Sequence, residues 1–468
     1  MGLVLGFLYW RTLLPSMGTW GDPAKLQFLG KVLGTPHLSG TPLYLILNHV
    51  FVTYFPKGTL ALKANLLSAI FSIAAVWFLF AVLLDLDFSF VISFITALIF
   101  GVGYTMWSWS LLAEVYTLTT LFFMMVIFFL LRWNRTRKNW YFLAACLFYS
   151  LSFGNHLLVL GLLPAFIYIV LATDPRVMLD IRNITLVFLF LLLGISQYYY
   201  IIWRTNDPST AFLETDTRKF LAFIVSPGSS AMARYSIDEI LTNRLPRFFK
   251  YLWREYYFLI FGGLIGFFTI REKVIRRFIL IGLLSTFLVA LVRYAREYET
   301  YFLPFYVFFI ILVGYGLDWI ARRLPGSQRL VIIAILIPAV MVWVNYQKVD
   351  HHDRTLWARI TEKILTTIER DALILSPNYD NTAFFWYYLI GEGYESRNLY
   401  VMPVDYNKLE RVGDYLAGEE EFYLGVQRKS VPPGLRVFTM KGPERELENI
   451  GLQILPTNTK YIYEVRLP

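Results

Sequence analysis

The segment GDPAKLQFLGKVLGTPHLSGTPLY (21–44) has the residue types best suited to chemistry in this sequence. Asp22 follows the first apolar segment closely, where a membrane helix would reach water, and Lys25 and His37 come after it. A carboxylate in a partly desolvated mouth can act as a general base and take the proton of a hydroxyl group. Asp22 followed by Pro23 is also an ordinary helix start, and a capping residue can hold a carboxylate in place. We therefore expect Asp22 to be the catalytic base.

Other polar and aromatic residues stand near the ends of further apolar segments. Arginine offers permanently charged, forked donors to phosphate oxygens, and aromatic rings can stack on a sugar or line a groove for a lipid. Such a set suits transfer of a sugar from a polyprenyl phosphate to a hydroxyl group. The candidates are Asp22 and Glu114 for catalysis, Lys25, Arg204, Arg293 and Arg296 for the donor phosphate, and His37, Tyr116, Asn155, His156, Tyr199, Glu299 and Tyr301 for the rest of the substrate.

Simpler roles exist for several of these residues. Glu114 could pair with a nearby arginine, Asn155 and His156 could satisfy a helix end, and the aromatic residues could form an interfacial belt. The run His351-His352-Asp353 has metal-ligand types but lacks a third ligand at a suitable spacing, so we expect no metal site there. The sequence leaves open whether a divalent cation acts as a cofactor.

The composition indicates a membrane protein. Of the 468 residues, 57% are hydrophobic and only 16% are charged, which excludes an ordinary soluble globular chain. The excess of positive charge lies in short loops between apolar runs, so nucleic acid is not an expected partner. About 20 apolar residues cross a bilayer, and we expect about eleven transmembrane helices, at 1–14, 60–84, 89–106, 116–132, 140–153, 157–172, 184–203, 254–270, 276–292, 301–320 and 329–347.

The basic loops predict the orientation. With eleven spans and a cytoplasmic N-terminus, the four basic loops all face the cytoplasm, as the positive-inside rule requires. The basic loops are 132–138, 176–182, 271–277 and 322–329, and the loops expected on the outer face are 15–59, 104–115, 204–253 and 293–300. We expect a multi-pass protein of the plasma (inner) membrane.

The chain changes character at about residue 350. Residues 1–350 form the predicted transmembrane domain. In residues 351–468, short apolar runs alternate with amphipathic segments, which predicts a small extracytoplasmic α/β domain. This domain has no glycine-rich phosphate loop, so packing or acceptor recognition is its expected role.

Several motifs resemble a known family. The segment 21–44 is similar, without a gap, to the first outer loop of the large, mostly bacterial GT-C-like family that includes the eukaryotic plexin-type protein O-mannosyltransferase, where the pattern runs GDSGE, a helix, then HPPG-x-PLF. The similarity extends to the motifs KANLLSAIFSIAA, AEVYTL, SFGNHLL, NDPSTAF, ETYFLP and YYLIGEGYESRNLYVMPV. The resemblance implies the GT-C membrane fold, a polyprenyl-phosphate-linked sugar donor, an inverting transfer and Asp22 at the catalytic position.

One departure from the family pattern concerns charge. Where the family has a second carboxylate three residues after the aspartate, this sequence has Lys25, and HPPG has become HLSG (37–40). The loss of the second acid weakens the case for a metal at this loop. It also changes the charge where a phosphate or an acceptor would lie.

The expected function is transfer of a sugar to an acceptor hydroxyl on a protein, a glycan or a lipid at the outer face of the membrane. A transporter or flippase of lipids or sugars is the main alternative, but such proteins keep polar groups near the bilayer midplane, often in repeated halves. Here the polar residues gather at the outer ends of the spans, and no repeat is found. A non-catalytic membrane scaffold is the third alternative.

Overall fold

Long apolar helices dominate the first 350 residues, so this is a multi-pass membrane protein. Within the ranges given below, five helical stretches are long and apolar enough to cross a bilayer: Leu60–Asp85, Tyr116–Thr136, Ile181–Arg204, Lys273–Val292 and Tyr298–Ala321. Three shorter apolar stretches accompany them, at Phe90–Gly101, Leu157–Thr173 and Leu259–Thr269. The expected number of eleven spans therefore stays a prediction.

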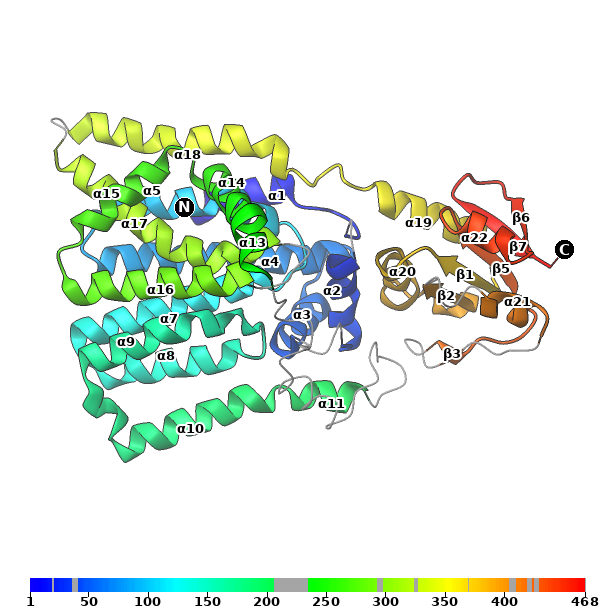
Figure 1. Ribbon diagram of the computed structural model, residues 1–468, viewed down its shortest axis with the longest axis horizontal. Coiled ribbons are helices and arrows are strands. Elements are labelled where there is room, and N and C mark those ends of the chain that lie inside the picture. Colours follow the sequence, from blue (N-terminus) through cyan, green and yellow to red (C-terminus); the bar gives the residue numbers. More distant parts are fainter. Residues whose placement is uncertain are drawn as a thin grey trace.

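The computed structural model describes residues 1–18, 21–35, 41–205, 235–292, 298–323, 327–368, 370–403, 410–418, 423–424 and 429–467. Helices α1 to α9 pack as a bundle, and α10 and α11 run along its edge (Figure 1). The helices of this half are α1 (Gly2–Thr12), α2 (Gly21–Val32), α3 (Pro42–Tyr54), α4 (Leu60–Asp85), α5 (Phe90–Gly101), α6 (Tyr104–Trp109), α7 (Tyr116–Thr136), α8 (Asn139–Ser152), η1 (Leu157–Leu162), α9 (Leu163–Thr173), η2 (Pro175–Met178), α10 (Ile181–Ser196) and α11 (Tyr199–Thr205).

The second half of the bundle starts with a short amphipathic segment and then returns to apolar helices. The predicted span 254–270 is wrong in its start, because the chain breaks at Tyr257, whose φ of 47° no helix can continue. The elements are α13 (Ile237–Glu239), η3 (Ile240–Arg244), α14 (Leu245–Tyr256), α15 (Leu259–Thr269), α16 (Lys273–Val292), η4 (Tyr298–Phe302), α17 (Leu303–Ala321) and α18 (Ser327–Val349).

Helices α15 and α17 approach each other backbone to backbone. A Cβ atom added to Gly266 would lie 1.8 Å from the carbonyl oxygen of Leu312, and one added to Gly316 would lie 1.9 Å from that of Gly262. No side chain fits at either position. Small residues allow two membrane helices to approach this closely. In lipid the hydrophobic effect does not drive helices together, so the van der Waals contacts of such close packing stabilise the pair.

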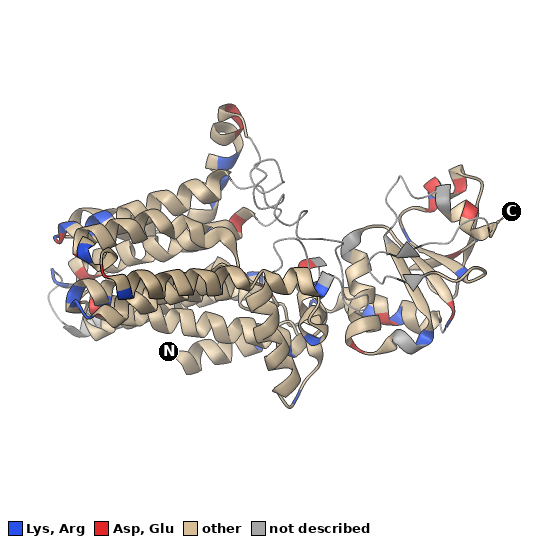
Figure 2. Ribbon diagram, turned by 90° about the horizontal axis from the view of Figure 1, so that it is seen from below, with Lys and Arg blue, Asp and Glu red and all other residues tan. Residues whose placement is uncertain are grey.

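The basic residues gather at the end of the bundle far from the C-terminal part (Figure 2). Arg132 pairs with Asp85 at 2.8 Å, which joins the ends of α7 and α4. Arg137 donates to the carbonyl oxygen of Thr173, which joins α7 to the end of α9. We call the opposite end, which carries α2, α3 and α6, the α2 end.

The C-terminal part holds a five-stranded sheet in the order β2-β1-β5-β7-β6. Strand β1 is parallel to both neighbours, whereas β7 is antiparallel to β5 and β6. All five residues of β1 are buried, as expected for a central strand covered on both faces. The elements are α19 (Leu356–Thr367), β1 (Ala372–Ser376), α20 (Tyr379–Trp386), η5 (Tyr387–Gly391), η6 (Tyr394–Arg397), β2 (Leu399–Pro403), α21 (Glu410–Leu416), β3 (Tyr423–Leu424), β4 (Lys429–Ser430), β5 (Arg436–Met440), α22 (Glu444–Asn449), β6 (Gln453–Pro456) and β7 (Ile462–Arg466).

Candidate active site at the α2 end

Asp22 lies in the first turn of α2, where the helix dipole favours a negative charge. Lys25 stands one turn later and forms an ion pair with it. The Asp22 side chain is 48% exposed and that of Lys25 only 7%, so the ammonium group approaches from the protein side and leaves the carboxylate open to the surface. A carboxylate so placed can meet a substrate hydroxyl.

A buried polar network fixes α2 against α4. Gln27 Nε2 donates to Asn65 Oδ1 over 2.9 Å, and Gln27 Oε1 accepts from the amide of Gly18 at the same distance. Asn65 Nδ2 donates to the carbonyl oxygen of Leu14, and Asn65 Oδ1 also accepts from the amide of Ala113. A single asparagine therefore joins the end of the first helix, the helix that bears Asp22 and the segment that leads to Glu114.

Glu114 is buried, with 4% of its surface exposed. Its amide donates to Ser68 Oγ over 3.2 Å, and its Oε2 atom accepts from the amide of Val115 over 3.3 Å. Burial raises the pKa of Tyr44, and the negative charge of Glu114 raises it further. A fully buried tyrosine of α3 and the carboxylate of Glu114 are thus close enough to interact electrostatically.

Three predicted substrate-binding residues meet in one aromatic cluster. The ring centroids of Tyr116 and His156 are 5.8 Å apart, those of His156 and Tyr301 are 5.8 Å apart, and those of Tyr116 and Tyr301 are 6.0 Å apart. Trp109 adds a fourth ring, 5.1 Å from Tyr116. The rings come from α6, α7, η4 and the turn before η1, so the fold assembles them from three distant parts of the chain.

Asn155 and His156 also have the structural roles that their sequence allowed. Asn155 Nδ2 donates to the carbonyl oxygen of Val115 and to Thr119 Oγ1, which holds the turn against α7. His156 Nδ1 accepts from the amide of Leu158 and caps η1. Because Nδ1 accepts, the proton of the neutral ring sits on Nε2, on the other side of the ring.

Arg204 lies against the other end of α2. Its Nε and Nη2 atoms donate to the carbonyl oxygens of Leu33 and Val32, over 2.7 and 2.9 Å. These carbonyl groups end α2 and have no partner within the helix. The guanidinium group therefore ties α11 to α2, while Tyr199 on α11 is 69% exposed.

Glu299 is paired within the structure. Its Oε2 atom accepts from Arg254 Nη2 at 2.6 Å, and the Arg254 guanidinium also lies 3.8 Å from the centre of the Tyr104 ring. Sequence reasoning missed Arg254, Gln27 and Asn65. Asn65 had a usable signal, since an amide inside an apolar run of membrane-spanning length needs a partner.

The remaining predicted residues, His37, Arg293 and Arg296, lie outside the described residues. Over the ranges that the structure describes, no group of three metal-ligating side chains occurs. The described candidates lie at the α2 end: Leu43 of α3 donates its amide to the carbonyl oxygen of Gly154, and Tyr200 of α11 donates to that of Gly34, so the loops at this end interlock.

Comparison with known sequences confirms the family resemblance. Residues 22–178 match the family of the N-terminal domain of the protein O-mannosyl-transferase TMEM260. The protein O-mannosyl-transferase TMEM260 of Mus musculus is 34% identical over 109 residues. That alignment covers 23% of this chain and 16% of the mouse protein, so the similarity concerns a small part of the relative.

Comparison with solved structures shows the GT-C fold along the whole chain. The crystal structure of ArnT from Cupriavidus metallidurans, bound to undecaprenyl phosphate, is 10% identical with a TM-score of 0.66, over 99% of this chain and 96% of that one. The arabinofuranosyltransferase AftD from Mycobacteria is 13% identical with a TM-score of 0.54, over 100% of this chain and 41% of that one. The expected helical membrane fold with a small sheet domain is confirmed, whereas the eleven spans and the extracytoplasmic placement of the sheet stay predictions.

Proposed function

We propose that this GT-C membrane protein, which resembles the TMEM260 O-mannosyltransferases, moves a sugar from a polyprenyl-phosphate donor to an acceptor hydroxyl. The main support for this proposal is the position of Asp22. It is a half-exposed carboxylate at the start of α2, and a buried network of hydrogen bonds anchors this helix. The position lies inside the matched segment 22–178. The undecaprenyl phosphate bound to the ArnT relative supports a lipid-phosphate donor.

The reaction assigns each described group a role. Asp22 takes the proton of the acceptor hydroxyl as its oxygen attacks the anomeric carbon, and the lipid phosphate leaves with the electron pair of the broken bond. Attack from the side opposite the phosphate inverts the anomeric carbon. Glu114, held by Ser68 and the amide of Val115, is the second catalytic carboxylate.

Donor and acceptor binding use the rest of the set. The cluster of Tyr116, His156 and Tyr301 offers ring faces for a sugar or an isoprenoid chain. Arg293 and Arg296, with Arg204 and Lys25, are assigned to the donor phosphate. The acceptor is a hydroxyl of a protein, a glycan or a lipid, and the reaction takes place on the outer face of the plasma membrane.

The assignment of the base is tested by Asp22→Asn. With polyprenyl-phosphate mannose as donor, we expect turnover to fall at least about a hundredfold, the usual scale for loss of a general base. Asp87→Asn is the matched control, because Asp87 is also an exposed aspartate paired with a basic residue, Arg135, but lies in the turn between α4 and α5, away from α2. Near-parental turnover of Asp22→Asn would remove Asp22 from the mechanism.

A further inference from the structure

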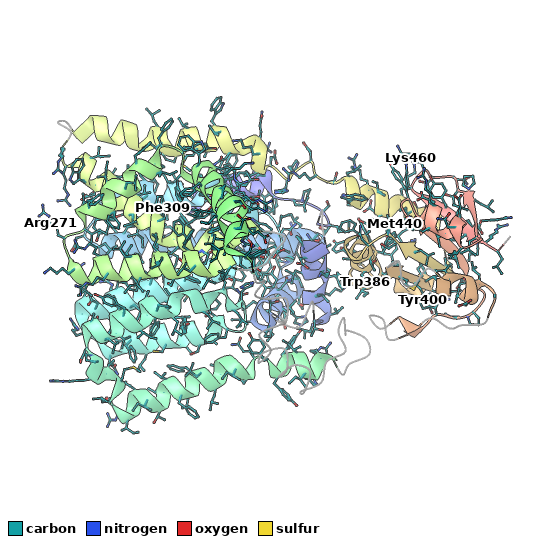
Figure 3. All side chains as sticks on the ribbon, viewed as in Figure 1. Arg271, Phe309, Trp386, Tyr400, Met440 and Lys460 are labelled. Atoms are coloured by element: carbon teal, nitrogen blue, oxygen red, sulfur yellow. The ribbon has the colours of Figure 1, made fainter. Side chains whose placement is uncertain are left out.

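The C-terminal part packs directly on the helix that carries Asp22. Phe28 of α2 and Trp386 at the end of α20 are both fully buried, and one cluster of buried apolar residues runs from the bundle through both of them to one face of the sheet. Figure 3 shows Trp386 at the edge of the C-terminal part nearest to α2. Helix α2 is therefore enclosed on two sides, by α3 and α4 of the bundle and by α20 and η5.

Gly391, the last residue of η5, lies in close contact with α2. A Cβ atom there would lie 2.8 Å from the Cβ of Phe28 and 3.1 Å from Cδ2 of Leu60. A Cβ atom cannot swing aside as the tip of a side chain can, so α2 or η5 would have to move. The carbonyl oxygen of Gly391 also accepts from Lys31 Nζ over 2.5 Å. Gly391 therefore contacts α2 in two ways. Its carbonyl group accepts a hydrogen bond from Lys31, and its lack of a side chain allows Phe28 to pack against its backbone.

Tyr387, at the start of η5, caps a second bundle helix. The amide of Ala61, in the first turn of α4, donates to the Tyr387 hydroxyl over 3.1 Å. The hydroxyl in turn donates to Glu392 Oε1 over 2.6 Å. The first amides of a helix lack partners within it, and Thr59 satisfies that of Leu62 while Tyr387 satisfies that of Ala61.

We propose that η5 and Glu392 of the C-terminal part are a positioning element that holds α2, and with it Asp22, in its working place. None of these residues touches the reacting atoms. They act through Phe28 and Lys31 on α2 and through Ala61 on α4, the helix whose Asn65 holds Gln27. The claim about Asp22 rests on the proposed function, whereas the hold on α2 does not.

Amide hydrogen exchange of the purified full-length protein tests the hold on α2. Gly391→Val should raise the exchange of the α2 amides at least about tenfold, equal to about 1.4 kcal/mol of local stability. Gly413→Val is the matched control, because a Cβ at this glycine of α21 meets nothing within 4 Å. Unchanged exchange in α2 of Gly391→Val would overturn the proposal.

Tyr387→Phe adds no atom and so serves if Gly391→Val does not fold. It should raise exchange in the first turn of α4 and lower kcat at least about tenfold, with little change in the KM for polyprenyl-phosphate mannose. Tyr388→Phe is its control, because the Tyr388 hydroxyl bonds Glu362 of α19 and not the bundle. A Tyr387→Phe enzyme with parental kcat, or with only KM changed, would refute the positioning role.

The two readouts separate this proposal from the proposed function. If the parental protein transfers no sugar, the proposed function fails, while faster α2 exchange in Gly391→Val still supports the hold on α2. If transfer occurs and exchange does not respond, the function stands and the positioning role is wrong.

Discussion

Lys25 stands where the family pattern described above has a second carboxylate, and in the structure it pairs with Asp22. The ammonium group lies on the protein side of Asp22, where the second carboxylate of the family pattern would stand. We expect chelation with EDTA to leave the turnover of the parental protein unchanged, because Lys25 already supplies a positive charge beside Asp22.

Lys25→Glu should create a binding site for a divalent cation beside Asp22. Two carboxylates three residues apart lie on one face of a helix and offer oxygen ligands to a divalent cation. Thermal melting of this variant should rise on addition of Mg²⁺ or Mn²⁺, whereas that of Lys25→Gln should not. Loss of parental turnover in EDTA would contradict this account of Lys25.

His351, just after the end of α18, should make the stability of the fold depend on pH. The ring is 2% exposed, and its amide donates to the carbonyl oxygen of Thr12. Burial, together with a smaller effect of the nearby positive charge of Arg354, lowers the pKa of His351 from 6.5 to about 3. The fold therefore favours the neutral ring.

The sign of the effect follows from these pKa values. Above pH 6.5 the ring is neutral in both states and costs nothing, and between pH 6.5 and about 3 only the unfolded chain takes up the proton. At pH 5 the loss should be about 2 kcal/mol, at 1.36 kcal/mol per pH unit. Melting temperatures between pH 7.5 and 5 should fall less for His351→Gln than for the parent; equal slopes would refute the assignment.

At the scale of elements, long apolar runs predicted helices well. The expected spans 60–84 and 116–132 correspond to α4 and α7, because length and apolarity alone decide whether a segment can cross a bilayer. The break at Tyr257 was missed, since an apolar run carries no sign of a single residue with positive φ. The order of the strands was not predicted: β5 lies beside β1, and β3 pairs with β4 outside the five-stranded sheet.

The candidate site was predictable as a set of residues at one end of the bundle, but not as contacts. Tyr116, His156 and Tyr301 stand at ends of different spans, which the topology brings to one side. That their rings touch, and that Gln27 bonds Asn65, depends on how distant helices pair. A single sequence holds no record of such pairs.

Asn65 should be the least replaceable polar residue of α4. Asn65→Leu would leave the carbonyl oxygen of Leu14, the amide of Gln27 and the amide of Ala113 without this partner. A buried group without a partner costs about 1–3 kcal/mol, so we expect a loss of at least about 3 kcal/mol, measured by denaturant unfolding in detergent.

The control for Asn65 lies at the far end of the bundle. Asn139 is exposed and bonds Asn183 of α10 over 2.6 Å. Asn139→Leu should cost about 1 kcal/mol, because it removes the partner of a single group, Asn183 Oδ1, whereas Asn65→Leu removes that of three. Similar losses of unfolding free energy in the two variants would show that the Asn65 network contributes no more to stability than an ordinary hydrogen bond.

At the scale of the whole molecule, the basic loops and the C-terminal sheet lie at opposite ends (Figure 2). This arrangement supports the proposed orientation, with basic loops in the cytoplasm and the sheet outside. Lys460→Cys, in a Cys146→Ala background, should react with a membrane-impermeant thiol reagent on intact cells, because Lys460 is exposed.

The opposite loop provides the control for this topology. Lys138→Cys in the same background should be labelled only after lysis, because its loop joins α7 and α8 at the basic end. Labelling of Lys138→Cys on intact cells, with Lys460→Cys protected, would invert the proposed orientation.

The glycine contact between α15 and α17 also bears on how the chain is made. Helix α15 has 11 residues, about half of what a bilayer needs, so it gains little from lipid alone. Its partner surface around Leu312 and Gly316 leaves the ribosome more than forty residues later. We therefore expect α15 to pack stably only after α17 has been made, and we expect a larger residue at Gly266 or Gly316 to increase degradation of the newly made chain.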